Sequence, residues 1–272
     1  MKQNIFFFFA TIFFASLTVV SCHKHDDEED LSGTGSIEIE FEHLAGGQAL
    51  DFSKNYVTAN GDTVRFTQFD YYVSNFVFTK DDGTEYVVPK DSCYFLVKHN
   101  VTGSNELKIN NVPAGNYTNV RFIIGVDSLK NTAPVAERKG VLDPVNGGAG
   151  MYWSWNSGYI FVKVEGTSPQ APFNANANAR IFQYHVGGFG GMNSATINNI
   201  KTVRFDAPEP TEPAKVRKTD TPHFHFYMDA LKMFNSPTKV NIATNPFAHF
   251  VPFSTTLSDN YKDMFKLDHI HN

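Results

Sequence analysis

The sequence predicts an all-β fold: a β-sandwich of the immunoglobulin-like or jelly-roll-like kind, with long loops and one or two short helices. The 272-residue chain contains 26 Phe and 11 Tyr but 2 Trp, and aromatic and β-branched residues favour strands. Short alternating or apolar runs, separated by Gly, Pro and Asn, recur along the chain, as is typical of sandwiches and barrels. The chain is long enough to bury one large core.

Residues 1–21 have the features of a lipoprotein signal peptide. Met1-Lys2-Gln3-Asn4 precedes an apolar run from Ile5 to Val20, which matches a positive region followed by a hydrophobic region. Val19-Val20-Ser21-Cys22 resembles a lipobox and predicts cleavage before Cys22 and acylation of that cysteine; an ordinary secretory signal is the alternative. His23 after Cys22 favours the outer membrane, so we expect a cell-envelope lipoprotein held to the membrane only by its lipid.

Residues 22–35 form an expected acidic tether, and residues 36–272 form the expected folded domain. The tether has charged residues, Gly and Ser but no apolar period, as solvated linkers do. If Cys22 is acylated, Cys93 is the remaining cysteine, so the domain has no internal disulfide. The formal net charge of -5 argues against nucleic acid as a partner.

The first expected strand, 36–44, alternates between two faces. Three apolar residues and His43 share the inward parity, whereas glutamates share the other. An inward histidine is either a hydrogen-bonded core residue or a ligand that needs companions. Further strands are expected at 63–78, 85–88, 94–97, 107–112 and 117–126.

A long loop, 127–150, precedes the segment that contains both tryptophans. Trp153 and Trp155 are two residues apart, so on extended backbone they point to one face, before an expected strand at 159–164. The pair can be packing or part of a site, because long loops on a rigid sheet are where sites are built. A short strand at 181–186 then carries His185.

The last part of the chain contains two His-x-His pairs, His223 with His225 and His269 with His271. On a strand such residues lie about 6–7 Å apart on one face, close enough to belong to one metal site. The alternative is ordinary polar alternation on an amphipathic strand. Short helices are expected at 230–234 and 260–267.

Imidazoles in an oxidising compartment, without a zinc-type cysteine pattern, favour copper. Hydrolase motifs such as Gly-x-Ser-x-Gly and His-Glu-x-x-His are absent from the sequence. Asp127, Asp143 and Glu165 could form a carboxylate pair, but nothing in the sequence determines their separation.

Taken together, these segments resemble the MbnP-like family of exported copper-associated β-proteins, to which MopE and CorA are related. The resemblance covers nearly all of the chain after the tether. It is carried by 41–44, 69–75, 124–128, 142–144, 150–159 (Gly-Met-Tyr-Trp-Ser-Trp-Asn-Ser-Gly-Tyr), 163–166, 185–188 (His-Val-Gly-Gly) and 259–272.

The resemblance implies a β-sandwich that binds copper through histidines. His43 and His185 are the expected ligands, Trp153 or Trp155 is the residue expected to be oxidised to kynurenine by a di-haem MbnH-like partner, and Asp127 is expected to support the site. His223, His225, His269 and His271 complete this site or form another. The chain lacks the Trp-x-His unit of MopE, because Trp155 stands where that histidine would be.

We therefore expect a copper-binding protein for acquisition, storage or delivery, and not an enzyme. The main alternative is a surface module that binds carbohydrate or protein on the platform of Trp153, Trp155 and Tyr159. A redox enzyme that turns over at the metal is a third hypothesis, which no sequence feature supports.

Overall fold

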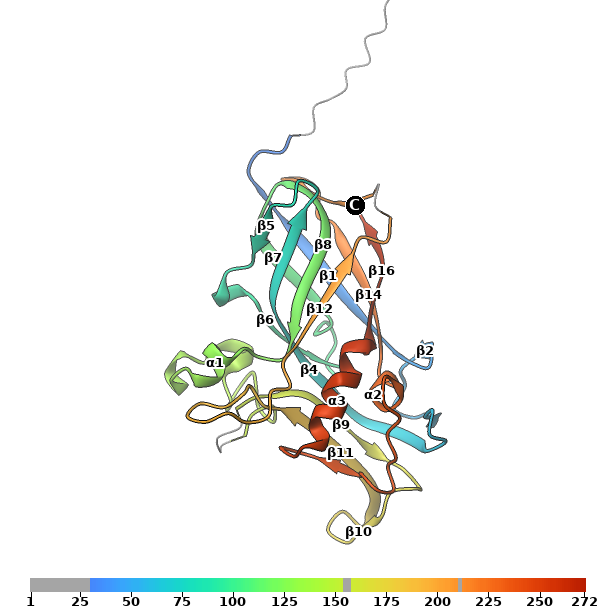
Figure 1. Cartoon of the computed structure of the whole chain (residues 1–272). Helices are drawn as coiled ribbons and strands as arrows, with labels where there is room; N and C mark the ends of the chain where they lie inside the picture. Colours follow the sequence, from blue (N-terminus) through green and yellow to red (C-terminus); the bar gives the residue numbers. More distant parts are fainter. Residues whose placement is uncertain (1–29, 154–157, 210–211) are drawn as a thin grey trace, which may run out of the picture. The chain divides into compact units, whose positions relative to one another are not determined.

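The computed structural model describes residues 30–153, 158–209 and 212–272, and Leu31–Asn272 forms one compact unit (Figure 1). Strands hold 46% of the chain and helices 13%, which confirms the all-β class. No helix of the described ranges is long and apolar enough to cross a membrane.

The smaller sheet has five strands in the order β16-β14-β1-β2, with β7 also paired to β1. The bounds are β1 Thr34–Ala45, β2 Gln48–Ala49, β7 Glu106–Pro113, β14 His223–Asp229 and β16 Phe265–His271. β1 runs parallel to β14, and its other pairings are antiparallel. The predicted alternation in β1 is present, because Ile37, Ile39 and Phe41 are fully buried while the glutamates between them face outward.

The larger sheet has eleven strands, with the path β10-β11-β9-β4-β8-β12. Strand β13 pairs with β8, β15 pairs with β11, and β3, β5 and β6 pair with β4. The bounds are β3 Tyr56–Val57, β4 Thr63–Lys80, β5 Glu85–Val87, β6 Tyr94–Lys98, β8 Gly115–Ile124, β9 Ile160–Thr167, β10 Phe173–Asn174, β11 Ala179–Gly187, β12 Lys201–Asp206, β13 Ala214–Val216 and β15 Phe247–Ala248.

Strand β4 joins the two halves of the larger sheet. Its first half pairs with β9 and its second half with β8, with irregular register between Ser74 and Val77. Asn75 lies in this irregular stretch with a φ of 56°, a left-handed conformation that asparagine tolerates better than most residues. The bulge lets one long strand serve both halves.

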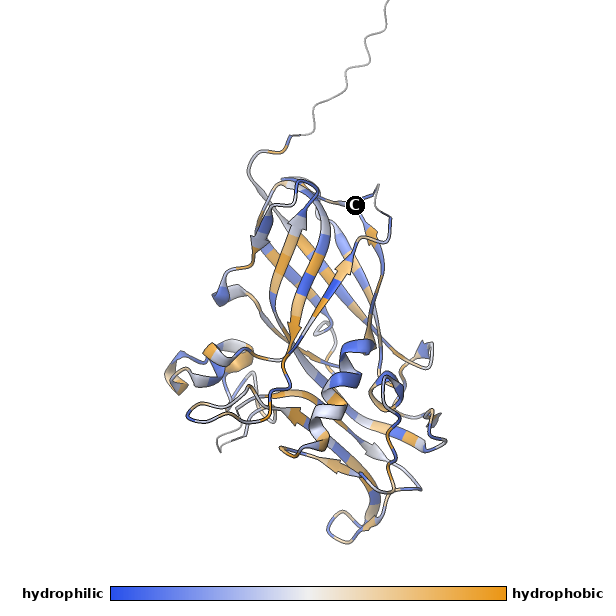
Figure 2. Cartoon of the chain, in the orientation of Figure 1, coloured by the Kyte–Doolittle hydropathy of each residue, from blue (hydrophilic) through white to orange (hydrophobic). Residues whose placement is uncertain are grey.

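The main core lies between the two sheets. Phe41 of the smaller sheet packs against the rings of Tyr71 and Phe122 of the larger sheet, with centroid distances of 6.0 Å to each. The alternation of apolar and polar residues that directs these rings inward is visible as bands of two colours along the strands (Figure 2). Helices α2 (Lys232–Asn235) and α3 (Phe253–Tyr261) pack on the same core, where Phe234 contacts Phe66 and Phe182.

A second, smaller core lies where the long loop packs on the larger sheet. Its buried residues include Tyr72, Leu142, Tyr159 and Phe161, and Trp153 packs against them. The loop is not irregular throughout, since it contains helix α1 (Ser128–Thr132) and the short 3-10 helices η2 (Val135–Glu137) and η3 (Gly140–Leu142).

The expected helix at 260–267 is wrong. Helix α3 ends at Tyr261, the 3-10 helix η4 covers Lys262–Met264, and β16 begins at Phe265. Phe265 and Leu267 are both buried against the sandwich core, and their two-residue spacing fits a strand. A further 3-10 helix, η1, covers Lys90–Ser92.

Candidate metal centre

The outward face of β4, β9 and β11 carries two rows of polar side chains. Asp70, Lys163 and His185 are direct neighbours across the three strands, and Gln68, Glu165 and Gln183 form the next row. Their neighbours in sequence, such as Val162 and Val164, point into the core. This strand alternation therefore places His185 on the face away from the main core.

His185 is held by a short hydrogen bond to Glu165. The distance from His185 Nε2 to Glu165 Oε1 is 2.6 Å, and Lys163 Nζ lies 3.6 Å from the same carboxylate oxygen. The hydrogen bond from His185, followed by the charge of Lys163, lowers the pKa of Glu165 to about 2. A carboxylate bound to one imidazole nitrogen orients the ring and leaves its other nitrogen for a ligand.

His249 lies against His185, and sequence reasoning missed it. Strand β15 pairs in parallel with β11 at Gln183 and Tyr184, and His249 follows it directly. The two imidazole rings are stacked, with a centroid distance of 4.5 Å and an interplanar angle of 20°. Burial and the nearby His185 lower the pKa of His249, which favours the neutral form that binds metal. No spacing in 247–250 marks this histidine as a ligand.

Trp153 borders the same place. A side-chain carbon added to Gly187, two residues after His185, would lie 2.7 Å from the six-membered ring of Trp153 and 2.4 Å from the carbonyl of Tyr159. The Trp153 ring is also 6.3 Å from that of Phe250, the residue after His249. Trp153 therefore lies at the end of β11 and near Phe250, the sequence neighbour of His249, whereas Trp155 lies outside the described residues.

His43 does not share this site, contrary to the expectation that it joins His185 at one ion. Its ring contacts Phe69 and Tyr71 on the inner face of β4, and His185 lies on the outer face of the same sheet. Its Nδ1 is 3.0 Å from His99 Nδ1 and its Nε2 is 3.0 Å from the Tyr71 hydroxyl. Burial, followed by the charge of His99, lowers the pKa of His43 to about 3. His43 is a hydrogen-bonded core residue here.

The four histidines of the two His-x-His pairs lie elsewhere, on the outward face of the smaller sheet. β14 and β16 pair so that His223 is opposite His271 and His225 is opposite His269. They meet each other, but they do not meet His185, because the two sheets expose opposite faces of the sandwich.

Asp127 does not lie among the histidines either. Its carboxylate accepts hydrogen bonds from the Asn75 amide at 2.7 Å, Tyr94 at 2.6 Å and Lys90 at 3.0 Å, and it caps α1. These donors outweigh burial and lower its pKa to about 2. Asp127 supports the tryptophan segment indirectly, because Asn131 of α1 accepts a hydrogen bond from the Tyr159 amide.

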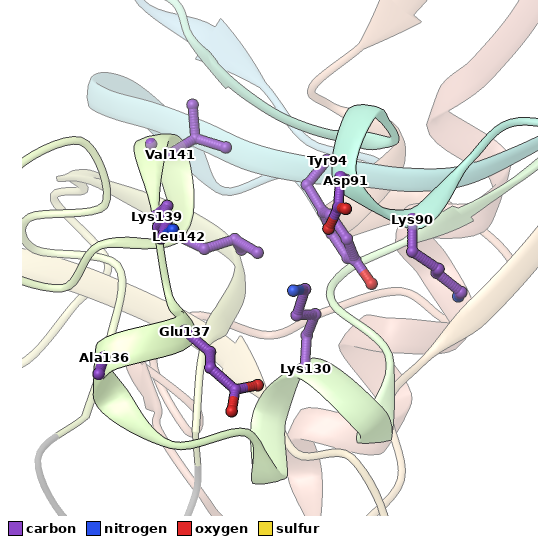
Figure 3. A pocket seen from close by; sticks show the side chains of 10 residues that line it. Lys90, Asp91, Tyr94, Lys130, Ala136, Glu137, Lys139, Val141 and Leu142 are labelled. Atoms are coloured by element: carbon purple, nitrogen blue, oxygen red, sulfur yellow. The ribbon is translucent and has the colours of Figure 1, made fainter.

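A pocket of about 630 Å³ lies near Asp127. Figure 3 shows Lys90, Lys130 and Lys139 with Glu137 and Tyr94 around it. No histidine of the described residues lines this pocket, so the pocket is separate from the pair formed by His185 and His249.

Comparison with known proteins identifies one family. The family model described as MbnP matches residues 34–252. A solved structure, MbnP from Methylosinus trichosporium, superimposes with a TM-score of 0.52 at 18% identity, covering 74% of this chain and 77% of that one. At this identity the structural match shows a shared fold. No curated protein sequence matches the chain.

Proposed function

Because the chain belongs to the MbnP family, a group associated with copper, we propose that it binds copper at the histidine pair beside Trp153. The observation that carries the proposal is the stacking of His185 on His249 at 4.5 Å. These two residues are 64 positions apart in the sequence, and only the parallel pairing of β11 and β15 brings them together.

The donor set fits copper. Imidazole nitrogens suit copper, zinc and nickel, and the carboxylate in direct contact with His185, that of Glu165, is engaged in a hydrogen bond with it. Ring nitrogens of His185 and His249 would hold the copper ion, and the hydrogen bond to Glu165 would keep the His185 ring in its orientation. Copper would supply a soft Lewis-acidic centre, and the side chains of His185, His249 and Glu165 would bind and orient it.

Trp153 is the residue we propose for oxidation to kynurenine. Its ring lies over Gly187, on the face that carries His185. A di-haem MbnH-like partner would accept the four electrons removed from the indole while two oxygen atoms from solvent are added and the ring opens to N-formylkynurenine. Hydrolysis would then release the formyl carbon as formate, so the net change is a gain of one oxygen atom and a loss of one carbon atom. Trp153 packs against the second core, which favours this role over that of an open stacking platform for carbohydrate.

A lipid on Cys22 would anchor the domain to the outer membrane through the charged segment that precedes the compact unit. The compact unit begins at Leu31 and β1 at Thr34, so the folded part starts before the expected residue 36. The protein would act in copper acquisition, storage or delivery without turnover of its own.

The test is copper stoichiometry after anaerobic loading and desalting. We expect the wild-type chain to retain copper at this site, and His185→Ala/His249→Ala to lose it, because both proposed nitrogen donors are removed. The matched control is His43→Gln, which changes a buried histidine of β1 in the smaller sheet and should keep the copper. Equal copper retention by wild type and the His185→Ala/His249→Ala protein would refute the assignment.

Intact mass of protein from its native host tests the modification. A gain of one oxygen and loss of one carbon, located at Trp153 by peptide mapping, is the expected result. An unmodified Trp153 in copper-loaded native protein would remove kynurenine from the proposal and leave the histidine site to the previous test.

A further inference from the structure

Seven polar side chains meet on the outward face of the smaller sheet, on three adjacent strands. Glu40 and Glu42 come from β1, His223 and His225 from β14, and Asp268, His269 and His271 from β16. We call His223, His225, His269, His271 and Asp268 the outer histidine cluster. We propose that this cluster is a second metal site, which takes a divalent ion of the zinc class.

The geometry of three members already approaches that of a metal centre. One ligand atom from each of His225, Asp268 and His269 lies within 4.8 Å of the other two, and within the described ranges of the chain this is the one such group. In tetrahedral zinc sites with bonds of about 2.0–2.1 Å, ligand atoms are separated by about 3.3 Å. Small side-chain rotations would close the remaining gap.

A β-bulge builds this ligand set. His225 is opposite His269 and Phe226 is opposite Leu267, so Asp268 is the extra residue of β16. In a regular strand Asp268 would point away from the face that carries His269. The bulge turns its carboxylate to the same face, where Asp268 Oδ2 lies 2.8 Å from His269 Nδ1.

Other side chains add imidazole nitrogens and carboxylate charge around His225 and His269. The rings of His225 and His269 are stacked at a centroid distance of 4.7 Å, and His271 Nε2 is 2.9 Å from His269 Nε2. Glu42 Oε2 is 3.3 Å and Glu40 Oε2 is 3.9 Å from His225 Nε2. Four imidazoles and three carboxylates in one patch suit a borderline divalent cation.

One ring nitrogen of His225 lacks a hydrogen-bond partner within the described part of the chain. Its Nδ1 is buried and has no hydrogen-bond partner among the described residues, and such atoms are uncommon in folded proteins. The outer histidine cluster also lies apart from the proposed copper site, because it is on the smaller sheet and His185 is on the larger one. The family match ends at residue 252, before β16, so three members of the cluster lie beyond the matched segment.

A bound ion would connect β16 to β14 and β1. The test therefore combines zinc titration of the lipid-free chain by calorimetry with amide hydrogen exchange of residues 265–271. We expect wild type and His185→Ala/His249→Ala to bind Zn²⁺ equally at this site and to show slower exchange in β16. We expect His225→Ala/His269→Ala to bind Zn²⁺ at least about tenfold more weakly and to show no such protection.

His269→Gln serves as the milder variant, because the His269 side chain is 41% exposed and its loss leaves no buried hole. It should also weaken zinc binding while keeping the circular dichroism spectrum of the wild type. Unchanged exchange in β16 upon addition of zinc, or equal zinc affinity in wild type and His225→Ala/His269→Ala, would overturn the proposal. Zinc binding lost only in His185→Ala/His249→Ala would likewise overturn it, and would show that the other site takes zinc.

Discussion

At the scale of single residues, the face of a strand decides what a histidine does. His43 points inward, and both its ring nitrogens are hydrogen-bonded, to His99 and Tyr71. His185 points outward, and one of its nitrogens is bound to Glu165. The inward ring must stay neutral to remain buried, while the outward ring has a nitrogen available for an ion.

The buried His43 makes stability depend on pH. Its pKa is about 3 in the folded protein against 6.5 for an ordinary histidine, so below pH 6.5 the unfolded chain binds more protons at this position. Above pH 6.5 the neutral His43 ring costs the folded protein no stability. As the pH falls from 6.5 towards about 3, the free energy of unfolding decreases by at most about 1.4 kcal/mol per pH unit because of this residue.

Urea unfolding at about pH 7.5 and about pH 5 measures this effect. We expect His43→Gln to lose less stability than wild type on acidification, because glutamine does not titrate. The difference in slope between the two proteins isolates this residue from the carboxylates, which titrate in both. Parallel stability curves for the two proteins would contradict the assignment.

At the scale of elements, the pairing of short strands builds the histidine pair proposed to bind copper. β15 has two residues, but its parallel pairing with β11 delivers His249 to His185. At the end of β11, Gly187 leaves room for Trp153, because an added side-chain carbon would lie 2.7 Å from its ring and 2.4 Å from the Tyr159 carbonyl. The end of β11 therefore requires glycine.

Gly187→Ala should displace the tryptophan segment. We expect a loss of about 1–3 kcal/mol in the free energy of unfolding, because the backbone carbonyl of Tyr159 cannot yield cheaply. Copper affinity should fall as well, and the tryptophan fluorescence spectrum should shift. Gly115→Ala is the control, since the three atoms nearest to a carbon added there belong to the flexible end of the Lys80 side chain. Wild-type fluorescence and copper affinity in Gly187→Ala would show that Trp153 does not depend on this close approach.

At the scale of the whole described unit, one core couples the two sheets. Phe41 of β1 contacts Phe226 and Phe265 within its own sheet at 5.4 Å and 5.7 Å. It contacts Tyr71 and Phe122 of the larger sheet at 6.0 Å each. The two sheets should therefore unfold together.

Phe41→Ala should lower the free energy of unfolding by about 3–5 kcal/mol, because it leaves a cavity between the sheets. Phe173→Ala is the control: Phe173 is 57% exposed, so its loss should change stability by no more than about 0.5 kcal/mol. Near-ultraviolet circular dichroism and intrinsic fluorescence should report one coincident transition in both proteins. Separate transitions would mean that the sheets do not share one core.

The alternation of apolar and polar residues was sufficient to predict many of the strands and the faces of their side chains. The alternation in 36–44 predicts both the strand and the inward face of His43. The two-residue spacing of His223 and His225 predicts that they share one face of a strand, as they do on β14. The helix expected at 260–267 failed because Phe265 and Leu267 also fit a strand, and the pairing with β14 decides between the two. The family resemblance, from the tryptophan block and the histidine-glycine segment, is confirmed by the match over 34–252.

By itself, the sequence determined the all-β class, the face of each main strand and the family. The tertiary structure decided which side chains meet: His249 joins His185, His43 remains in the core, and the two His-x-His pairs meet each other on the opposite sheet. The physical reason is that strand alternation has a period of two residues and can be read locally. Strand pairing joins segments far apart in the chain through backbone hydrogen bonds that carry no side-chain signature, so the partners of each histidine follow only from the closed fold.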